Sequence, residues 1–326
     1  MELIIESGAT KSDWIVISRH KKREIKQFTT EGLNVSAMPM NSIAKIIEDA
    51  GEKLLLTEPD LYNDPYQEAQ GPNNGLHTGV NNKLHTGPIE KIYLYLAGVA
   101  SEENKEQLNK LLLYHISPSA KVEIETDLMA AARGICGRNP GIIGILGTGS
   151  NACFYDGRQV VDKINPGGYI LGDEGSAACL GKLFISDYIK GLIPEEVARD
   201  FQNKQISEKN HISDYARIIE QVYKSETPSK YLGSLAPFIL KHYNNPYIKE
   251  IVDNNIRSFF RRLLIPLLER NIPKQCSIKG EKLPIGIMGG FGLTCKEIIK
   301  RIAEEFNVEI TSFYSSPIEG LIRYHL

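Results

Sequence analysis

The stretch that decides the fold is Gly141–Asn151, GIIGILGTGSN. Its apolar run, Ile142–Leu146, is short and rich in β-branched residues, which favours a buried strand. The run ends in Gly147-Thr148-Gly149-Ser150, where two glycines alternate with two hydroxyl residues. Such a turn can point several backbone N–H groups at one spot, which suits a phosphate. An ordinary glycine turn with hydroxyl caps explains the same residues equally well.

A second stretch of the same kind lies close to the N-terminus. The apolar run Leu3-Ile4-Ile5 leads into Glu6–Ser12, ESGATKS, which is rich in small and hydroxyl-bearing residues. Two strand-and-turn units of this type, far apart in the sequence, predict two lobes that bind one polyphosphate.

Four motifs taken in order resemble one family. GATKSDW at 8–14 and ILGTGSN at 145–151 are followed by GGYILGDEGS at 167–176 and IMGGFG at 287–292. Together they resemble the N-acetylglucosamine kinase-like proteins. The superfamily of these proteins also contains the ATPase activators of benzoyl-CoA reductase and 2-hydroxyacyl-CoA dehydratase. The resemblance extends from Met1 to the SPIEGLIRYH sequence at 316–325.

The resemblance implies an α/β fold with two lobes of the actin-like ATPase (ribonuclease H-like) type and a nucleotide cleft between them. It also implies ATP and Mg²⁺ as cofactors, with phosphoryl transfer to a hydroxyl of an amino sugar. N-acetylglucosamine, phosphorylated at the 6-position, is the first candidate acceptor, and N-acetylmuramic acid or a similar sugar is the next. Closure of the lobes would exclude water from the reaction.

The composition bounds the kind of protein. The 326 residues, of which 42% are hydrophobic, are enough for two lobes with separate cores. The formal net charge of -2 gives no reason to expect nucleic acid or an acidic membrane as a partner. The five cysteines are odd in number and include no CxxC pair, so we expect reduced thiols in a cytoplasmic protein. No apolar run approaches the roughly 20 residues of a membrane span. A homodimer is considered as the oligomeric state.

The pattern of apolar residues predicts the domain organisation. The first lobe would comprise residues 1–118, with a polar insertion near 57–88. The second would comprise residues 119–314, with a helical insertion at 194–271. A final helix at 315–326 would return to the first lobe. The second lobe would begin with the strand Val122–Glu125, followed by an alanine-rich helix.

The polar insertion contains a short tandem repeat. Asn73–Gly79 is repeated almost unchanged at Asn81–Gly87, and such a composition cannot bury enough surface to fold alone. His77 and His85 could bind a metal together, but a solvated loop insertion is the simpler interpretation. Further along, Pro266 should bend or end the long helix that carries Phe259 and Phe260, both expected in the core.

The site residues come from the resemblance. Asp127 would be the general base that accepts the proton of the attacking hydroxyl, although an aspartate at a helix start can also act as an N-cap. Glu6 would help to place Mg²⁺. The phosphates would be bound by Thr10, Lys11, Ser12, Gly147, Thr148, Gly149 and Ser150, the adenosine by Gly289 and Gly290, and the sugar by Asn34, Gly149, Asn151, Gly168, Tyr169 and Asp173.

Two departures from the family pattern keep alternatives open. Glu6, Ser7 and Ala9 stand where relatives often have Asp-Gly-Gly/Ser, which raises the alternative of a catalytically weak sugar-binding protein. The link between the paired glycines and the GDEG run is only Tyr169–Leu171, shorter than is usual in the family. The other alternative is an ATPase activator of a 2-hydroxyacyl-CoA dehydratase-type enzyme. Such an activator needs a cluster bridging two subunits, and the cysteines show no cluster spacing.

Overall fold

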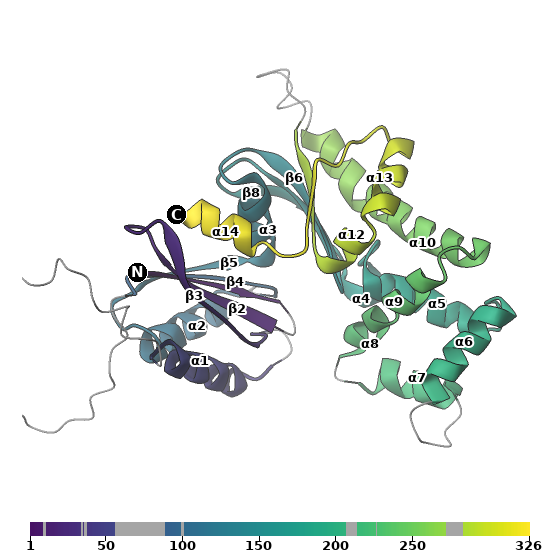
Figure 1. Cartoon of the computed structure of the whole chain (residues 1–326), viewed down its shortest axis with the longest axis horizontal. Helices are drawn as coiled ribbons and strands as arrows, with labels where there is room; N and C mark the ends of the chain where they lie inside the picture. The colour runs from purple at the N-terminus through teal and green to yellow at the C-terminus, as the bar shows by residue number, and fades with distance from the viewer. Residues whose placement is uncertain are drawn as a thin grey trace, which may run out of the picture. The chain divides into compact units, whose positions relative to one another are not determined.

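The structure is a computed structural model, which describes residues 1–8, 11–33, 35, 38–55, 89–98, 101–206, 214–225, 227–271 and 283–326 (Figure 1). Contacts within the chain divide it into two compact units. The first comprises Met1–Ala130 with Leu321–Leu326, and the second comprises Ala131–Gly320. Each unit is built on a five-stranded mixed sheet.

The sheet of the first unit has the order β3-β2-β1-β4-β5. β1 pairs antiparallel with β2 and parallel with β4, and β4 pairs parallel with β5. β5 is therefore an edge strand of this sheet, and the expectation that it opens the second lobe is wrong. The pairing of β5 with β4 places β5 in the first sheet. The sequence analysis missed this because a pattern of apolar residues does not show which strands pair. The strands are β1 (Glu2–Ser7), β2 (Lys11–Ser18), β3 (Arg23–Glu31), β4 (Lys91–Leu96) and β5 (Lys121–Thr126).

The two faces of this sheet are covered by different helices. α1 (Met40–Leu55) and α2 (Glu102–His115) lie along one face, and alternate residues of the strands meet them in one apolar core (Figure 1). On the other face of β4 stand Tyr93 and Tyr95. The His325 ring of α14 (Ile318–His325) lies 3.8 Å from the Tyr93 ring centre, and its Nε2 lies 2.8 Å from the Tyr95 hydroxyl.

The sheet of the second unit has the order β10-β9-β6-β7-β8. The run that favoured a buried strand forms β6, the central strand, which confirms the prediction. β6 pairs antiparallel with β7 across the glycine turn and parallel with β9. The strands are β6 (Gly141–Leu146), β7 (Ser150–Tyr155), β8 (Val160–Ile164), β9 (Ile285–Met288) and β10 (Ser312–Tyr314).

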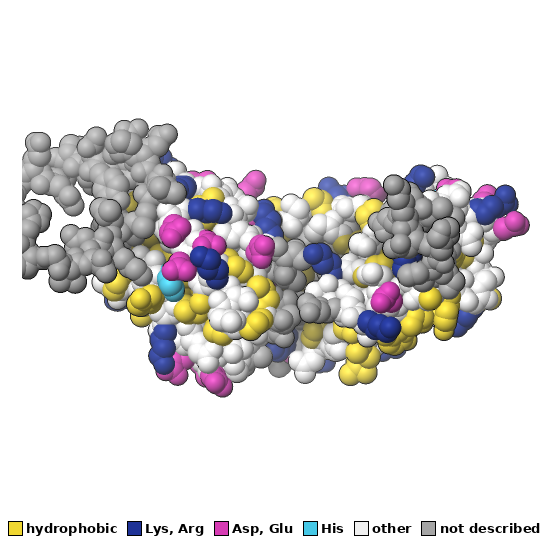
Figure 2. All heavy atoms as spheres, turned by 90° about the horizontal axis from the view of Figure 1, so that it is seen from below, with side chains coloured by type: hydrophobic (Ala, Val, Ile, Leu, Met, Phe, Trp, Pro, Cys, Tyr) yellow, Lys and Arg dark blue, Asp and Glu magenta, His cyan; other side chains and the backbone are white. Residues whose placement is uncertain are grey.

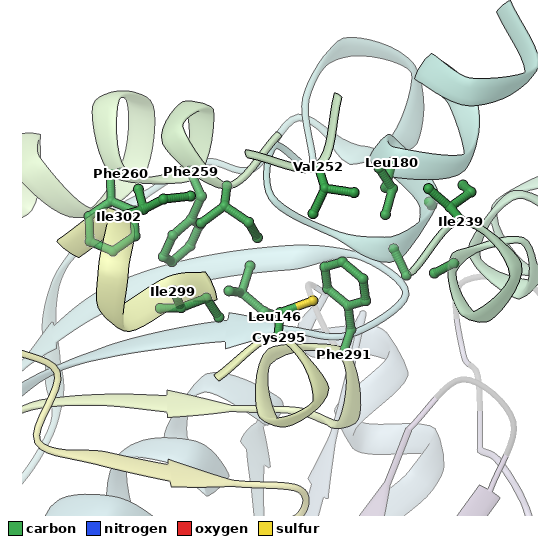
Figure 3. Packing of buried hydrophobic residues seen from close by; sticks show 14 of the residues in the cluster. Leu146, Leu180, Ile239, Val252, Phe259, Phe260, Phe291, Cys295, Ile299 and Ile302 are labelled. Atoms are coloured by element: carbon green, nitrogen blue, oxygen red, sulfur yellow. The ribbon is translucent and has the colours of Figure 1, made fainter. Parts of the chain in front are cut away.

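Helices bury one face of this second sheet. Figure 3 shows Leu146 of β6 packed among side chains of α5, α10, α12 and α13, with Val252 and Phe259 above it. Phe259 and Phe260 are fully buried, as expected. The further helices of the described chain, which do not all cover this face, are α3 (Asp127–Cys136), α4 (Gly168–Leu171), α5 (Ala177–Tyr188), α6 (Glu195–Ile206), α7 (Asp214–Tyr223), α8 (Pro228–Ser234), α9 (Ala236–Lys241), α10 (Pro246–Phe259), α12 (Gly290–Thr294) and α13 (Lys296–Glu305).

The long helix does not end at Pro266. α10 widens into a π-helical turn, Phe260–Leu264, directly before the proline, and helical structure continues to Asn271. A proline lacks the N–H that an α-helical turn requires, and its ring crowds the preceding turn. The wider turn accommodates both defects.

Within the described ranges, no helix combines the length and the apolar character needed to cross a membrane. On the face seen in Figure 2, acidic and basic side chains are interspersed.

Candidate functional site

In the first unit, the candidate residues gather where the parallel strands end. The last residues of β1, β4 and β5 are in register, because Ser7 pairs with Leu96 and Leu96 pairs with Thr126. Ligands of α/β sheets bind outside these carboxyl ends. Glu6 is the last residue but one of β1, and Asp127 follows β5 directly. The fold thus brings the expected metal residue and the expected base to one edge of one sheet.

The carboxyl group of Glu6 has a strongly shifted pKa. The pKa of its carboxyl is raised to about 7, mainly by burial and then by the negative charges of Asp13 and Asp127, while Lys11 opposes the rise. The cause is a concentration of carboxylates where little water can screen them. A cation at this edge would relieve the repulsion. Among the described residues there is no cluster of three or more His, Cys, Asp or Glu side chains suited to a metal ion. A cation at Glu6 would therefore take most of its ligands from water or phosphate oxygens.

Asp127 is the first residue of α3, as predicted, but it shares the capping role. Its Oδ1 accepts a hydrogen bond from the Leu128 amide at 2.9 Å. The Thr126 hydroxyl accepts another from the Met129 amide at 3.2 Å. Thr126 therefore acts as a cap to the first turn. Sequence reasoning missed it, although a hydroxyl residue directly before the helix was the available signal.

The two residues that begin β2, Lys11 and Ser12, were both expected to bind phosphate, but their surroundings differ. Lys11 is 58% exposed, and its Nζ lies 2.8 Å from Asp13. Ser12 is fully buried, and its hydroxyl contacts the Ser7 hydroxyl at 2.8 Å and the Glu31 carbonyl oxygen at 3.0 Å. Lys11 can reach a phosphate, whereas the Ser12 hydroxyl is committed to the interior. Two further expected residues, Thr10 and Asn34, lie outside the described residues.

In the second unit, the glycine turn after β6 is joined to the start of α5. The Gly147 amide donates to the Gly149 carbonyl at 2.9 Å and closes the turn. The amides of Ala177 and Ala178 donate to the carbonyls of Gly147 and Thr148, each at 3.0 Å. The positive end of α5 thus faces this turn, which favours an anion nearby.

The side-chain hydroxyl of Ser150, at the end of the turn, is buried without a hydrogen-bond partner among the described residues. A buried hydroxyl without a partner is costly and points to a ligand or water that would complete it. The neighbouring Asn151 is half-buried, and its Oδ1 accepts the Ala152 amide at 3.0 Å.

Asp173 lies against the same turn. Its Oδ1 accepts a hydrogen bond from the Ser150 amide at 3.3 Å, and a Cβ added to Gly149 would lie 3.1 Å from its Oδ2. Asp173 is 8% exposed, and its backbone is left-handed with φ of 56°. Burial raises the pKa of this carboxyl, and the Ser150 amide opposes the rise. The structure therefore brings Asp173 against Gly149 and Ser150, from which it is distant in the sequence.

The paired glycines form a short helix that the sequence did not reveal. α4 contains Gly168 and Tyr169, and a side chain of α5 holds it in place: Lys182 Nζ donates to the Tyr169 carbonyl at 2.9 Å. Four residues are too few to show a helical period. The Lys182 contact fixes the path that leads from the paired glycines to Asp173.

The last glycine turn follows β9. Gly289 has φ of 117°, and a Cβ there would lie 2.4 Å from the Leu146 carbonyl oxygen. Gly290, which begins α12, has no atom within 4 Å of an added Cβ. Gly289 thus permits close packing against β6, whereas Gly290 leaves open space in which a flat group could lie.

Comparison with known proteins places the chain. It matches no protein-family model and no curated protein. A solved structure of a putative N-acetylglucosamine kinase from Porphyromonas gingivalis is 30% identical, with a TM-score of 0.78, covering 100% of this chain and 98% of that one. The fold is shared by a putative N-acetylglucosamine kinase from Chromobacterium violaceum (15% identity, TM-score 0.57, 100% and 99% covered) and by a ROK hexokinase from Thermus thermophilus (13%, 0.51, 99% and 97%). The chain belongs to the N-acetylglucosamine kinase-like family and has the two-lobed actin-like ATPase and sugar kinase fold.

Proposed function

We propose that this protein is an ATP-dependent kinase that phosphorylates a hydroxyl of an amino sugar, with N-acetylglucosamine and its 6-hydroxyl as the first candidate. The observation that carries the proposal is the identity of 30% over full length with the Porphyromonas gingivalis protein, which is named a putative N-acetylglucosamine kinase. The separate sites of the two units support it, since each contains groups of the kind that a phosphoryl transfer needs.

The residues present fit a nucleotide. The turn after β6 would offer the hydroxyl of Ser150, which has no partner among the described residues, to a phosphate oxygen, and the positive end of α5 lies beside it. Lys11 is exposed and provides a positive charge. Gly290 leaves space for a planar base. These groups would bind the phosphates and the adenosine of ATP.

The chemistry would rest on Asp127. Its carboxylate accepts the proton of the sugar hydroxyl as the hydroxyl oxygen forms a bond to the γ-phosphorus. The bond from that phosphorus to the β–γ bridging oxygen breaks, and ADP leaves with the electron pair. Mg²⁺ placed near Glu6 would supply charge neutralisation for the phosphates. Asn34 and Asp173 would orient the sugar by accepting or donating hydrogen bonds to its hydroxyls.

The dehydratase-activator alternative receives no support from the four cysteines that the structure describes, a set that does not include Cys276. Cys136, Cys153, Cys179 and Cys295 are all buried, whereas a cluster that bridges two subunits needs cysteines at the surface. The alternative of a weak sugar-binding protein depends on Glu6. Its side chain has the same charge as the aspartate of the family and is longer by one methylene. Since Mg²⁺ keeps several waters, an outer-sphere contact can absorb the extra length.

The test is a screen of acceptors. The purified protein is incubated with Mg-ATP and with N-acetylglucosamine, N-acetylmuramic acid, glucosamine or glucose, and ADP release is followed in a coupled assay. Phosphorus NMR of the product then identifies the phosphorylated position. Turnover of an acetylated amino sugar at least tenfold above glucose would support the proposal. ADP release that no sugar stimulates would refute it, and thermal stabilisation by sugar without turnover would favour the weak binder.

A further inference from the structure

A buried asparagine in α10 contacts the backbone of the segment that carries Asp173. Asn255 is 1% exposed, and its side-chain oxygen accepts a hydrogen bond from the Gly175 amide at 3.0 Å. Its side-chain nitrogen donates to the Ser176 carbonyl at 3.1 Å. Both ends of the side-chain amide are therefore used, and the two backbone partners allow only one orientation of it. A residue of a distant helix thus holds two consecutive residues of the GDEGS sequence at 172–176.

The segment from Asp173 to Ser176 is a tight turn that rests on α10. The Ser176 amide donates to the Asp173 carbonyl at 3.1 Å, which closes the turn. Gly175, its third residue, has φ of 82°, and a Cβ there would lie 2.4 Å from the Cβ of Phe259. A positive φ at the third position is typical of a type II turn. Asn255 and Phe259 are one helical turn apart, so one face of α10 supports the turn by hydrogen bonding and by packing.

The two hydrogen bonds of Asn255 are not equivalent. The Ser176 carbonyl also accepts the Leu180 amide at 3.0 Å, so it keeps a partner when the Asn255 side chain is removed. The Gly175 amide also lies near the thiol of Cys179, but sulfur is a weak acceptor. Loss of the Asn255 oxygen would therefore leave a buried N–H with little compensation. The bond to Gly175 is the one on which the turn depends.

Asp173 begins this turn, and its carboxylate accepts the Ser150 amide beside the glycine turn after β6. We infer that Asn255 is a positioning residue for the amino-sugar acceptor: by holding Gly175 it fixes the turn, and the turn fixes the direction of the Asp173 carboxylate. The inference rests on the proposed function, in which Asp173 orients a sugar hydroxyl. Asn255 acts through the turn and not by contact with the sugar, because its side chain is buried beneath the turn.

Asn255→Ala should weaken acceptor binding more than nucleotide binding. With the Gly175 amide released, the turn samples other conformations, and the KM for the sugar should rise about tenfold with a smaller fall in kcat. The KM for ATP should stay within about threefold, because the glycine turn after β6 is joined to α5 by other contacts. The amides of Ala177 and Ala178 still donate to its carbonyls.

Three single variants test the inference by their KM values for sugar and for ATP. Asn255→Ala removes both hydrogen bonds. Asn255→Leu also removes them but keeps a side chain branched at the same carbon, so it replaces the alanine variant if that variant does not fold. Asn254→Ala is the matched control, because Asn254 is the neighbouring asparagine of α10 and is exposed, with its side-chain oxygen bonded to Arg257. We expect a raised sugar KM in the Asn255 variants and not in the control.

A double-mutant cycle with Asp173→Asn shows whether Asn255 acts through Asp173. Asp173→Asn alone removes the carboxylate that Asn255 is inferred to position. Adding Asn255→Ala to it should therefore lower the sugar kcat/KM by less than a further twofold. A role of Asn255 in the fold alone would not depend on Asp173, and the two reductions would then multiply.

The outcomes separate the inference from the proposed function. A wild type without amino-sugar turnover refutes both. If the wild type does turn over an amino sugar, a folded Asn255 variant with an unchanged sugar KM overturns the inference alone, and so do reductions that multiply in the cycle. Equal rises in the KM values for sugar and ATP would indicate general damage and also overturn it. Failure of both Asn255 variants to fold would show a residue required by the fold itself and would count against the inference.

Discussion

The Asp173 carboxylate accepts a hydrogen bond from the backbone amide of Ser150 at 3.3 Å, although Ser150 begins β7 and Asp173 lies in the segment before α5. The contact holds the carboxylate against the glycine turn. Because its orientation is set before any ligand arrives, Asp173 can orient a sugar hydroxyl at little cost in conformational entropy.

Asp173→Asn should therefore damage acceptor binding selectively. Asparagine tolerates the left-handed backbone at this position, so the fold is retained, but the amide cannot accept hydrogen bonds on both arms. We expect sugar kcat/KM to fall at least tenfold, with the KM for ATP within about twofold. Asp200→Asn, an exposed change in α6, is the control for the same chemical substitution. An unchanged sugar kcat/KM would remove Asp173 from the acceptor site.

Asp127→Asn should abolish most of the turnover while leaving nucleotide binding intact. The amide retains the shape of the side chain but cannot take the proton of the attacking hydroxyl, so kcat should fall roughly a hundredfold or more. Titration calorimetry with an ATP analogue checks that nucleotide affinity is preserved. Asp49→Asn in α1, whose carboxylate pairs with the exposed Lys45, serves as the control. Activity within a few-fold of wild type would exclude Asp127 as the base.

Glu6 can be tested by length and by charge. Glu6→Asp keeps the charge and removes one methylene, and Glu6→Gln keeps the length and removes the charge. If Glu6 helps to place Mg²⁺, Glu6→Gln should lower activity at least tenfold and raise the Mg²⁺ concentration needed for half-maximal rate. An unimpaired Glu6→Gln would show that Glu6 is no metal residue. An inactive wild type rescued by Glu6→Asp would identify a weakened enzyme.

The raised pKa of Glu6 also predicts how stability depends on pH. The pKa of Glu6 is about 7 in the folded state against an ordinary value of 4.5, so the folded state holds the proton more tightly than the unfolded chain. Stability from this group is therefore fully present below pH 4.5 and is lost as pH rises to 7 and above, by at most about 3 kcal/mol. Thermal unfolding of the metal-free protein should show Glu6→Gln more stable than wild type at pH 8 and equal at pH 4.5. Equal Tm values at both pH values would contradict this.

Two adjacent glycines should respond differently to the same change. In Gly289→Ala the new Cβ would lie 2.4 Å from the Leu146 carbonyl oxygen on a backbone with φ of 117°. We expect a loss of about 2 kcal/mol or more, seen as a lower midpoint of urea unfolding. Gly290→Ala meets no atom within 4 Å and should leave stability within about 0.5 kcal/mol. Its effect should instead be a raised KM for ATP. The reverse order of stabilities would contradict the packing described.

Features that depend on neighbouring residues were predicted from the sequence, whereas features that depend on distant residues were not. β6 and the helix that begins at Asp127 were predicted because a buried apolar run and an alanine-rich stretch after a strand are local signals. The sheet to which β5 belongs was not predicted correctly, because the pairing of β5 with β4 joins segments that are distant in the sequence. Helical structure up to Asn271 was expected, but the π-helical turn before Pro266 was not, because such a turn leaves no trace in residue spacing.

The candidate site shows the same division. The motifs located Asp127, Asp173 and the glycine turns, but the burial of Ser12 was invisible. A serine in a hydroxyl-rich turn looks the same whether its side chain faces a phosphate or the Glu31 carbonyl. The contact between Asp173 and Ser150 also could not be predicted, because it depends on the conformation of two loops that are distant in sequence.

The first unit is discontinuous, and this governs the order in which the protein can mature on the ribosome. Leu321–Leu326 belong to it, yet they are synthesised after the whole of Ala131–Gly320. The tyrosine face of β4 must therefore wait for His325, so the unit that is begun first is finished last. Folding from the N-terminus, the usual order during translation, is thereby inverted. A nascent chain that ends at Gly320 should expose the tyrosine face of the first sheet to chaperones, although every residue of the second unit has been synthesised.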